Sequence, residues 1–78
     1  MTMGQACLKK GEEKDILAGG LWIYDNELAW VDEFCQDGGI VDVLDNRERF
    51  IARGYFNSKS KIQILKFLLF TIQLKMVN

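Results

Sequence analysis

The chain has 78 residues, of which 49% are apolar and 27% charged, and its formal net charge is −1. This length allows one small domain, and the apolar fraction is typical of a globular rather than a disordered chain. A domain of this size buries only about 60–65% of its unfolded surface. It has no room for a cofactor-binding domain beside the fold itself, which argues against an independent enzyme.

The near-neutral net charge conceals segments of opposite sign. Residues 15–45 contain eight acidic side chains and no basic one, whereas residues 46–78 contain seven basic side chains and one acidic. A polyanion responds to the local patch that it meets, so the basic segment is compatible with nucleic-acid binding. Alternatively, the acidic and basic segments pair with each other across a sheet. The two interpretations do not exclude each other.

The chain contains two cysteines and no histidine. Cys7 and Cys35 lack CxxC partners, so no metal site is expected, and the amino-terminal segment lacks the apolar core of a secretory signal. We expect two reduced, partly buried thiols and a cytoplasmic protein. The carboxyl-terminal apolar run is interrupted by lysines and is shorter than the roughly 20 residues of a membrane span, so no membrane partner is expected.

The segment from Leu8 to Ala18 is predicted to start in a short edge strand and then to turn helical. Two glutamates at positions 12 and 13 favour the positive amino end of a helix, and Gly19 suits a left-handed cap. The helix has few apolar residues, so it must be short and lie on a sheet.

Leu21–Tyr24 is rich in aromatic and β-branched residues and is predicted to be a strand. We expect Trp22 in the core, because so small a domain needs its large aromatic side chains inside. The following residues 27–35 fit either one helical turn or an irregular edge strand.

The second half of the chain predicts three further strands. Ile40–Leu44 carries two valines on one face, and residues 45–48 suit a hairpin turn. In Arg49–Phe56, alternation assigns Phe50, Ala52, Gly54 and Phe56 to one face and Arg49, Ile51, Arg53 and Tyr55 to the other. After a polar loop, another strand begins at Ile62. The predicted fold class is mainly β with a short helix (α+β), arranged as a small, nearly closed barrel.

No catalytic constellation is present in the sequence. Histidine, the usual general base near neutral pH, is absent, and the glycine doublets at 19–20 and 38–39 lack the GxGxxG spacing of a nucleotide loop. The sequence therefore predicts a non-catalytic module without a cofactor.

The segments LKKGEEKDILAGGLWIYDNELA and GGIVDVLDNRERFIARGYFNSKSKI, between Leu8 and Ile62, match a known family in order and spacing. They resemble the amino-terminal PUA-like domain of the large-subunit ribosomal RNA cytosine-5 methyltransferases. The resemblance implies a PUA-like pseudo-barrel that binds structured ribosomal RNA. It also implies that methyl transfer from S-adenosylmethionine belongs to a separate catalytic domain. Glu48 stands where the family has a turn glycine.

RNA recognition needs cations for phosphates and exposed planar groups for unstacked bases. Arg53 and Tyr55 lie two residues apart on one strand face, and the following loop offers amide, hydroxyl and ammonium donors. The predicted RNA-binding residues are Lys9, Lys10, Lys14, Arg49, Arg53, Tyr55, Asn57, Ser58, Lys59 and Lys61. The alternative is a protein-interaction or structural domain that keeps the fold without binding RNA.

The chain is predicted to divide into a PUA-like RNA-binding domain, residues 1–64, and an apolar tail, residues 65–78, that departs from the family pattern. As a strand, the tail would be apolar on both faces. An unprotected apolar edge invites pairing with a second copy. We therefore predict a homodimer or higher oligomer formed through residues 65–77.

Overall fold

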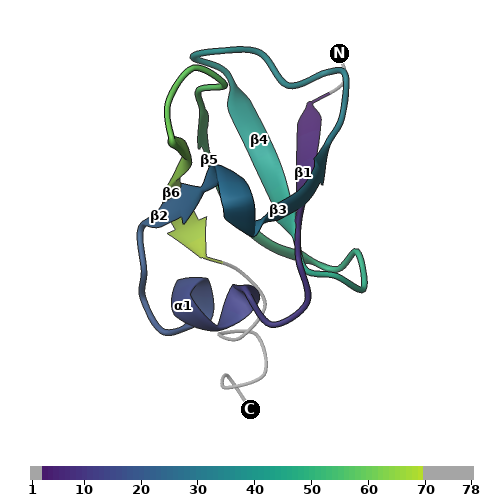
Figure 1. Cartoon of the computed structure of the whole chain (residues 1–78), viewed down its shortest axis with the longest axis vertical. Coiled ribbons are helices and arrows are strands. Elements are labelled where there is room, and N and C mark those ends of the chain that lie inside the picture. Colours follow the sequence, from purple (N-terminus) through teal and green to yellow (C-terminus); the bar gives the residue numbers. More distant parts are fainter. Residues whose placement is uncertain (1–2, 70–78) are drawn as a thin grey trace.

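Within residues 3–69, six strands form one curled sheet, and a short helix lies across an end of it (Figure 1). The computed structural model describes residues 3–69, with the backbone alone at 68 and 69. The elements are β1 (Gly4–Leu8), α1 (Glu13–Leu17), β2 (Trp22–Tyr24), the 3-10 turn η1 (Asp25–Glu27), β3 (Leu28–Val31), β4 (Ile40–Leu44), β5 (Phe50–Phe56) and β6 (Ile62–Leu69). The predicted class, mainly β with one short helix in a small pseudo-barrel, is confirmed.

The strand order explains how the sheet becomes a pseudo-barrel. Neighbouring strands follow the order β2-β6-β5-β4-β1-β3, and β1 and β4 form the parallel pair. The two edge strands, β2 and β3, are consecutive in the chain and are joined by η1 alone. The chain therefore bridges the two edges of its own sheet. β1 lies between β4 and β3, so the prediction of an edge strand at Leu8 was wrong.

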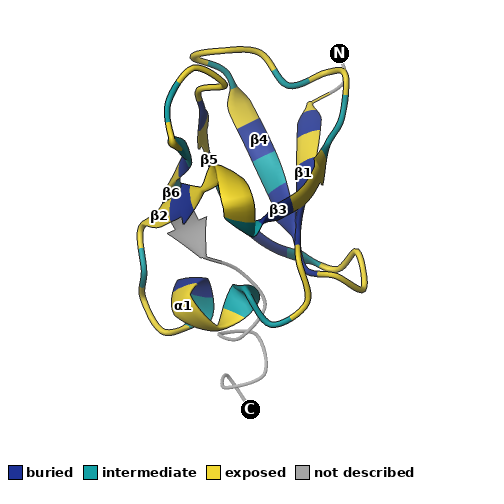
Figure 2. Ribbon diagram, in the orientation of Figure 1, coloured by how far each residue is buried: buried dark blue, intermediate teal, exposed yellow. Residues whose placement is uncertain are grey.

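Alternation of side chains builds the interior. On β4, Val41 and Val43 are fully buried, while Asp42 between them faces outward, as predicted. Figure 2 shows the same alternation of buried and exposed residues along the strands. The buried cluster consists of Ala6, Leu8, Ile16, Ile23, Leu28, Val41, Val43, Ile51, Ala52, Phe56 and Ile64.

Helix α1 contributes one fully buried side chain, Ile16, to this cluster. The helix ends before Gly19, whose φ of 111° is the left-handed conformation predicted for its cap. Two predicted features, a short helix lying on a sheet and a glycine stop, are confirmed. Among residues 3–69, no helix is long and apolar enough to cross a membrane.

A β-bulge in β5 changes the predicted faces. Phe50 pairs with Leu44 and Ala52 pairs with Val43, which leaves Ile51 as an extra residue. Ile51 is buried in the core, and the half-buried Phe50 ring lies on the outer side, 5.4 Å from the Arg53 guanidinium. The assignments of Phe50 and Ile51 were therefore wrong, because simple alternation holds only in an unbulged strand.

Trp22 also differs from its prediction. Its side chain is 53% exposed, whereas Ile23 beside it is fully buried. Because successive residues of a strand face opposite sides, burying Ile23 turns Trp22 and Tyr24 outward. The ambiguous residues 27–35 contain the edge strand β3, preceded by the turn η1.

Candidate nucleic-acid interface

Seven of the ten predicted RNA-binding residues lie in two groups at opposite ends of the molecule, and Arg49, Arg53 and Tyr55 lie in or next to β5. The β5–β6 loop carries Asn57, Ser58, Lys59 and, at its end, Lys61; α1 and the segment before it, at the other end, carry Lys9, Lys10 and Lys14 (Figure 1). All seven of these residues are exposed. The helix lies toward the end of the molecule that carries the β4–β5 turn, away from the β5–β6 loop (Figure 1). Of the other predicted residues, only Arg49 therefore lies at the same end as the lysines at residues 9–14.

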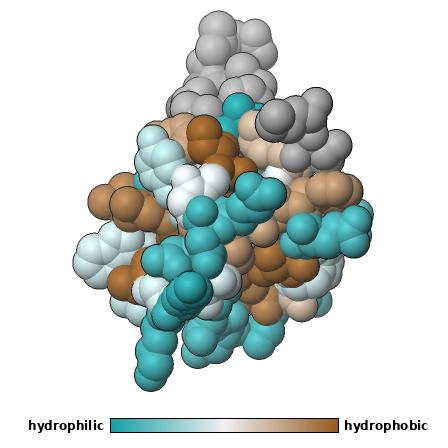
Figure 3. All heavy atoms as spheres, turned by 90° about the horizontal axis from the view of Figure 1, so that it is seen from above, coloured by the Kyte–Doolittle hydropathy of each residue, from teal (hydrophilic) through white to brown (hydrophobic). Residues whose placement is uncertain are grey.

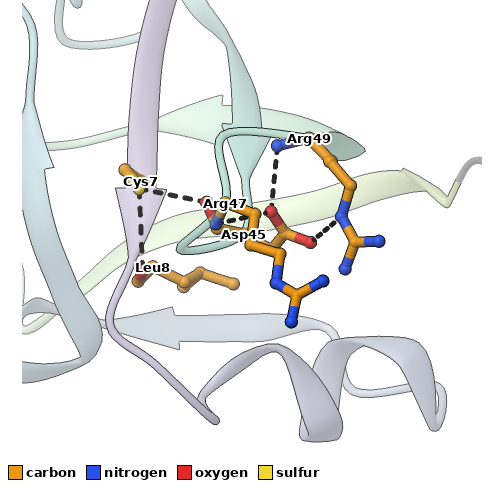
Figure 4. Close-up of polar contacts among 5 residues, drawn as sticks. All are labelled: Cys7, Leu8, Asp45, Arg47 and Arg49. Carbon is orange, nitrogen blue, oxygen red and sulfur yellow. Dashed lines mark hydrogen bonds and ion pairs between the residues drawn. The ribbon is translucent and has the colours of Figure 1, made fainter.

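Asp45 organises the β4–β5 turn, and it is 2% exposed. Its Oδ1 accepts hydrogen bonds from the backbone N–H groups of Arg47 at 3.0 Å and Arg49 at 2.9 Å, and its Oδ2 accepts one from Arg49 Nε at 2.8 Å (Figure 4). Burial alone would raise the pKa of Asp45, but the bonds from Arg49 and Arg47 outweigh it and hold the pKa below its ordinary value. Arg49, although 67% exposed, is thus tied to the turn.

Arg53 is paired as well. Its Nε donates to Asp42 Oδ1 at 2.7 Å, and the two residues are direct partners in the β4–β5 register. This ion pair confirms at one position the alternative that acidic and basic segments pair across the sheet, while the Asp45–Arg49 pair joins the same two segments within the β4–β5 turn. These two arginines therefore offer a ligand less net positive charge than the sequence suggests.

The β5–β6 loop is held by its own polar side chains. Asn57 Oδ1 accepts the backbone N–H of Lys59 at 3.0 Å, and both the N–H and the hydroxyl of Ser58 donate to the Asp37 carboxylate. The bonds from Ser58 lower the pKa of Asp37. Ser58 is therefore turned toward the protein, whereas the ion pairs of residues 3–69 involve neither Lys59 nor Lys61.

An exposed apolar row crosses the outer face of the sheet beside this loop. Trp22 opposes Leu65, Leu65 opposes Tyr55, and Tyr55 opposes Ile40, so the row runs across β2, β6, β5 and β4 in register. These residues are between 42% and 53% exposed. Phe67 extends the row, with its ring centroid 4.8 Å from that of Tyr55. Of these residues, only Tyr55 was in the predicted site. The exposure of Trp22 could have been inferred from the sequence, because Trp22 and Ile23 are neighbours on a strand and face opposite sides.

The row borders a shallow depression of about 500 Å³. Its lining consists of Trp22, Gly38, Tyr55, Phe56, Asn57, Ser60, Ile62 and Leu65. In the space-filling view, hydrophobic surface likewise lies open between polar side chains (Figure 3). Aromatic, amide and hydroxyl groups thus meet at one place on the surface.

The two cysteines are free thiols, as predicted. Burial, together with the nearby Asp32 carboxylate, raises the pKa of Cys35 to about 11, and burial raises that of Cys7. Both are protonated near neutral pH and are poor nucleophiles. Within the described part of the chain, no group of three or more histidine, cysteine, aspartate or glutamate residues is placed to hold a metal ion.

Comparison with known proteins identifies the fold family. The model of the PUA-like domain family matches residues 7–64. The chain belongs to this family. The matched part is a PUA-like domain, and it agrees with the resemblance carried by residues 8–62.

Two curated relatives of this PUA-like domain are both named ribosomal RNA large subunit methyltransferase I, from two strains of Klebsiella pneumoniae. Each is 30% identical to the chain over 56 residues, which cover 72% of this chain and 14% of the relative. The chain thus spans about one seventh of the length of these relatives.

Proposed function

We propose that this PUA-like domain is a non-catalytic RNA-binding module that holds structured RNA by backbone and base-stacking contacts. The observation that carries the proposal is the exposed row Trp22–Leu65–Tyr55 beside a loop with two lysines. Stacking platforms and adjacent cations are what single strands and loops of RNA require. The name of the two relatives supports ribosomal RNA as the ligand. A cytoplasmic location is part of the same proposal.

The ten predicted residues then differ in their roles. Tyr55, Asn57, Lys59 and Lys61 contact the RNA directly, while Arg53 and Ser58 hold the surface in shape through Asp42 and Asp37. The basic group at the opposite end, residues 9–14 with Arg49, reaches only an RNA that extends around the domain. We therefore expect the loop lysines to contribute more to binding of a short fragment than the lysines near α1.

The test is a titration of labelled ribosomal RNA fragments at several salt concentrations. Each phosphate contact contributes about −0.7 to −0.9 to the slope of log K against log salt. Lys59→Glu and Lys61→Glu should each weaken binding and make the slope shallower by about one contact. Arg47→Glu is the matched control, because Arg47 is exposed on the β4–β5 turn at the other end. Absence of binding by the unaltered chain at low salt would refute the proposal.

A second candidate function is a protein-interaction or structural domain. It is favoured by the same exposed apolar row and by the pairing of Arg49 and Arg53 with aspartates. In that case Leu65→Lys would abolish complex formation with a protein partner, and Lys59→Glu would leave that complex intact. Salt-dependent RNA binding that Lys59→Glu weakens would decide in favour of the RNA-binding function.

A further inference from the structure

Trp22 and Tyr55 stand on either side of Leu65, on three neighbouring strands. Two strand spacings separate the two aromatic residues, roughly 9–10 Å between their Cα atoms. All three side chains line the depression of about 500 Å³, within the size range of small-molecule sites. These two aromatic side chains and the aliphatic one between them, Trp22, Tyr55 and Leu65, offer stacking surface for one flat ring and are called the slot.

The polar rim of the slot has a defined hydrogen-bonding character. Asn57 Oδ1 accepts the N–H of Lys59 at 3.0 Å, which fixes the amide so that its NH₂ group is left to donate. Ser60 Oγ accepts the N–H of Ile62 at 3.1 Å, which leaves its hydroxyl hydrogen to donate. Both residues line the depression. The rim therefore offers a ligand two donors, while each of the two oxygens has one of its two lone pairs engaged by a turn.

We propose that this slot binds one unpaired guanine of an RNA, with the base stacked between Trp22 and Tyr55. Guanine presents two neighbouring acceptors, O6 and N7, to the donors of Asn57 and Ser60. Adenine presents a single acceptor on that edge, N7, beside its N6 amino group, so only one of the two donors would find an acceptor. The inference rests on the proposed RNA binding and names the base at that site.

Charge favours a nucleotide over a second copy of the chain in this slot. Lys59 and Lys61 lie on the same loop as Asn57 and Ser60, where they attract the phosphates on either side of a stacked base. A symmetric contact centred on the slot itself would bring the same basic loops together, whereas the homodimer predicted through residues 65–77 would be centred on the carboxyl-terminal side of the slot. The slot is therefore matched to a polyanion with an exposed ring.

Tryptophan fluorescence gives a direct measurement. A Trp30→Phe variant leaves Trp22 as the only tryptophan, and stacking of a base on Trp22 quenches its emission. We expect the hexanucleotide UUGUUU to quench Trp22 and to bind at least about fivefold more tightly than UUAUUU. Trp22→Ala and Tyr55→Ala, followed by fluorescence anisotropy of labelled RNA, should each weaken UUGUUU binding by about fivefold or more.

Two variants separate recognition from structure. Tyr24→Ala removes an exposed aromatic side chain from the same face of β2, outside the slot lining, and should leave binding unchanged. Asn57→Asp keeps an oxygen to accept the Lys59 N–H but replaces the NH₂ donor by an acceptor. It should abolish the preference for guanine over adenine, a ratio that phosphate repulsion cannot change because both hexanucleotides carry the same phosphates.

The outcomes distinguish this inference from the proposed function. Equal affinity for the two hexanucleotides, or no quenching of Trp22, overturns the guanine slot even where structured RNA binds. A guanine preference that survives in Asn57→Asp overturns it as well. Failure of structured RNA to bind at low salt refutes the proposed function, whereas preference for UUGUUU, lost in Asn57→Asp, would still support the slot.

Discussion

The buried carboxylate of Asp45 gives the sharpest prediction for stability. Asp45→Ala removes three accepted hydrogen bonds of 2.8–3.0 Å. The bond to the Arg49 side chain, which is 67% exposed, is worth at most about 1 kcal/mol. The two backbone bonds go to a charged acceptor in a turn at the surface, and each contributes about 1.5 kcal/mol, the lower end of the range for such bonds. We therefore expect the free energy of unfolding to fall by about 3–4 kcal/mol, a large share of the total for a small domain.

Chemical denaturation of the variants measures this loss. Arg49→Met is the matched control, because it removes the ion pair but keeps both backbone bonds to Asp45, and it should cost less than about 1 kcal/mol. A loss below about 1 kcal/mol for Asp45→Ala, or equal losses for both variants, would show that the turn does not depend on the backbone bonds.

The pH dependence of the same variant has a defined sign. The pKa of Asp45 is lowered in the folded state from an ordinary value of 3.8, so its stabilisation is present above that value. It is lost as the pH falls through the folded pKa, when the carboxylate is protonated. The stability difference between the unaltered chain and Asp45→Ala should be constant from pH 7 to about pH 5 and shrink below pH 4. An unchanged difference at pH 3 would refute the role assigned to the charge.

Three further predictions concern the turn, the β5–β6 pairing and assembly. Glu48 has a φ of 63°, a left-handed backbone conformation that is strained for a residue with a side chain. Glu48→Gly should therefore raise the free energy of unfolding by about 0.5–1 kcal/mol, and a lower melting temperature of the variant would contradict this strain. A Cβ on Gly54 would lie 2.5 Å from the carbonyl oxygen of Leu65, so Gly54→Ala should lower the unfolding free energy by about 1–3 kcal/mol; unchanged stability would show that β6 can move away. For the predicted homodimer through residues 65–77, sedimentation should show a dimer that Phe67→Lys converts to monomer. Its support is the exposure of Phe67 and the extension of β6 beyond its pairing with β2, whereas residues 70–78 lie outside the described part. An unaltered chain that is monomeric at high micromolar concentration would exclude that dimer.

Local pattern was enough to predict most elements of the fold. The alternation of β4 depends on neighbouring residues alone, and so do the acidic start of α1 and the glycine after it. Each signal reports a backbone preference that the folded state keeps. For this reason β4, α1 and the left-handed Gly19 were predicted correctly from the sequence.

The errors arose where the outcome depends on a distant partner. The bulge at Ile51 is defined by how β5 pairs with β4, and a single strand carries no mark of it. Trp22 was assigned to the core by its size, yet the interior of this small curled sheet is filled mainly by aliphatic side chains. Within the described residues, the core cluster contains one aromatic side chain, Phe56. The interior of a narrow barrel is packed closely, and the small aliphatic side chains fit it better than the large indole of Trp22.

The candidate site follows the same division. Tyr55 and the β5–β6 loop are consecutive in the chain, so the sequence placed them together, whereas the pairing of β2 with β6 that adds Trp22 and Leu65 joins residues far apart in the sequence. The lysines at residues 9–14 were grouped with the loop by their charge and by the resemblance to PUA-like domains, and the position of α1 separates them from the loop.

The balance of charge in residues 46–78 overstates what a ligand meets. Asp45 and Asp42 pair with Arg49 and Arg53, so part of that positive charge stabilises the turn and the β4–β5 pair. The cations left for phosphates on the β5–β6 loop are lysines, which are flexible point charges and give affinity that salt screens readily. Recognition that persists at physiological salt would then have to come from stacking and from the fixed donors of the loop. Under the proposed function, the internal pairing of Arg49 and Arg53 therefore assigns specific RNA binding to the proposed aromatic slot rather than to the net charge.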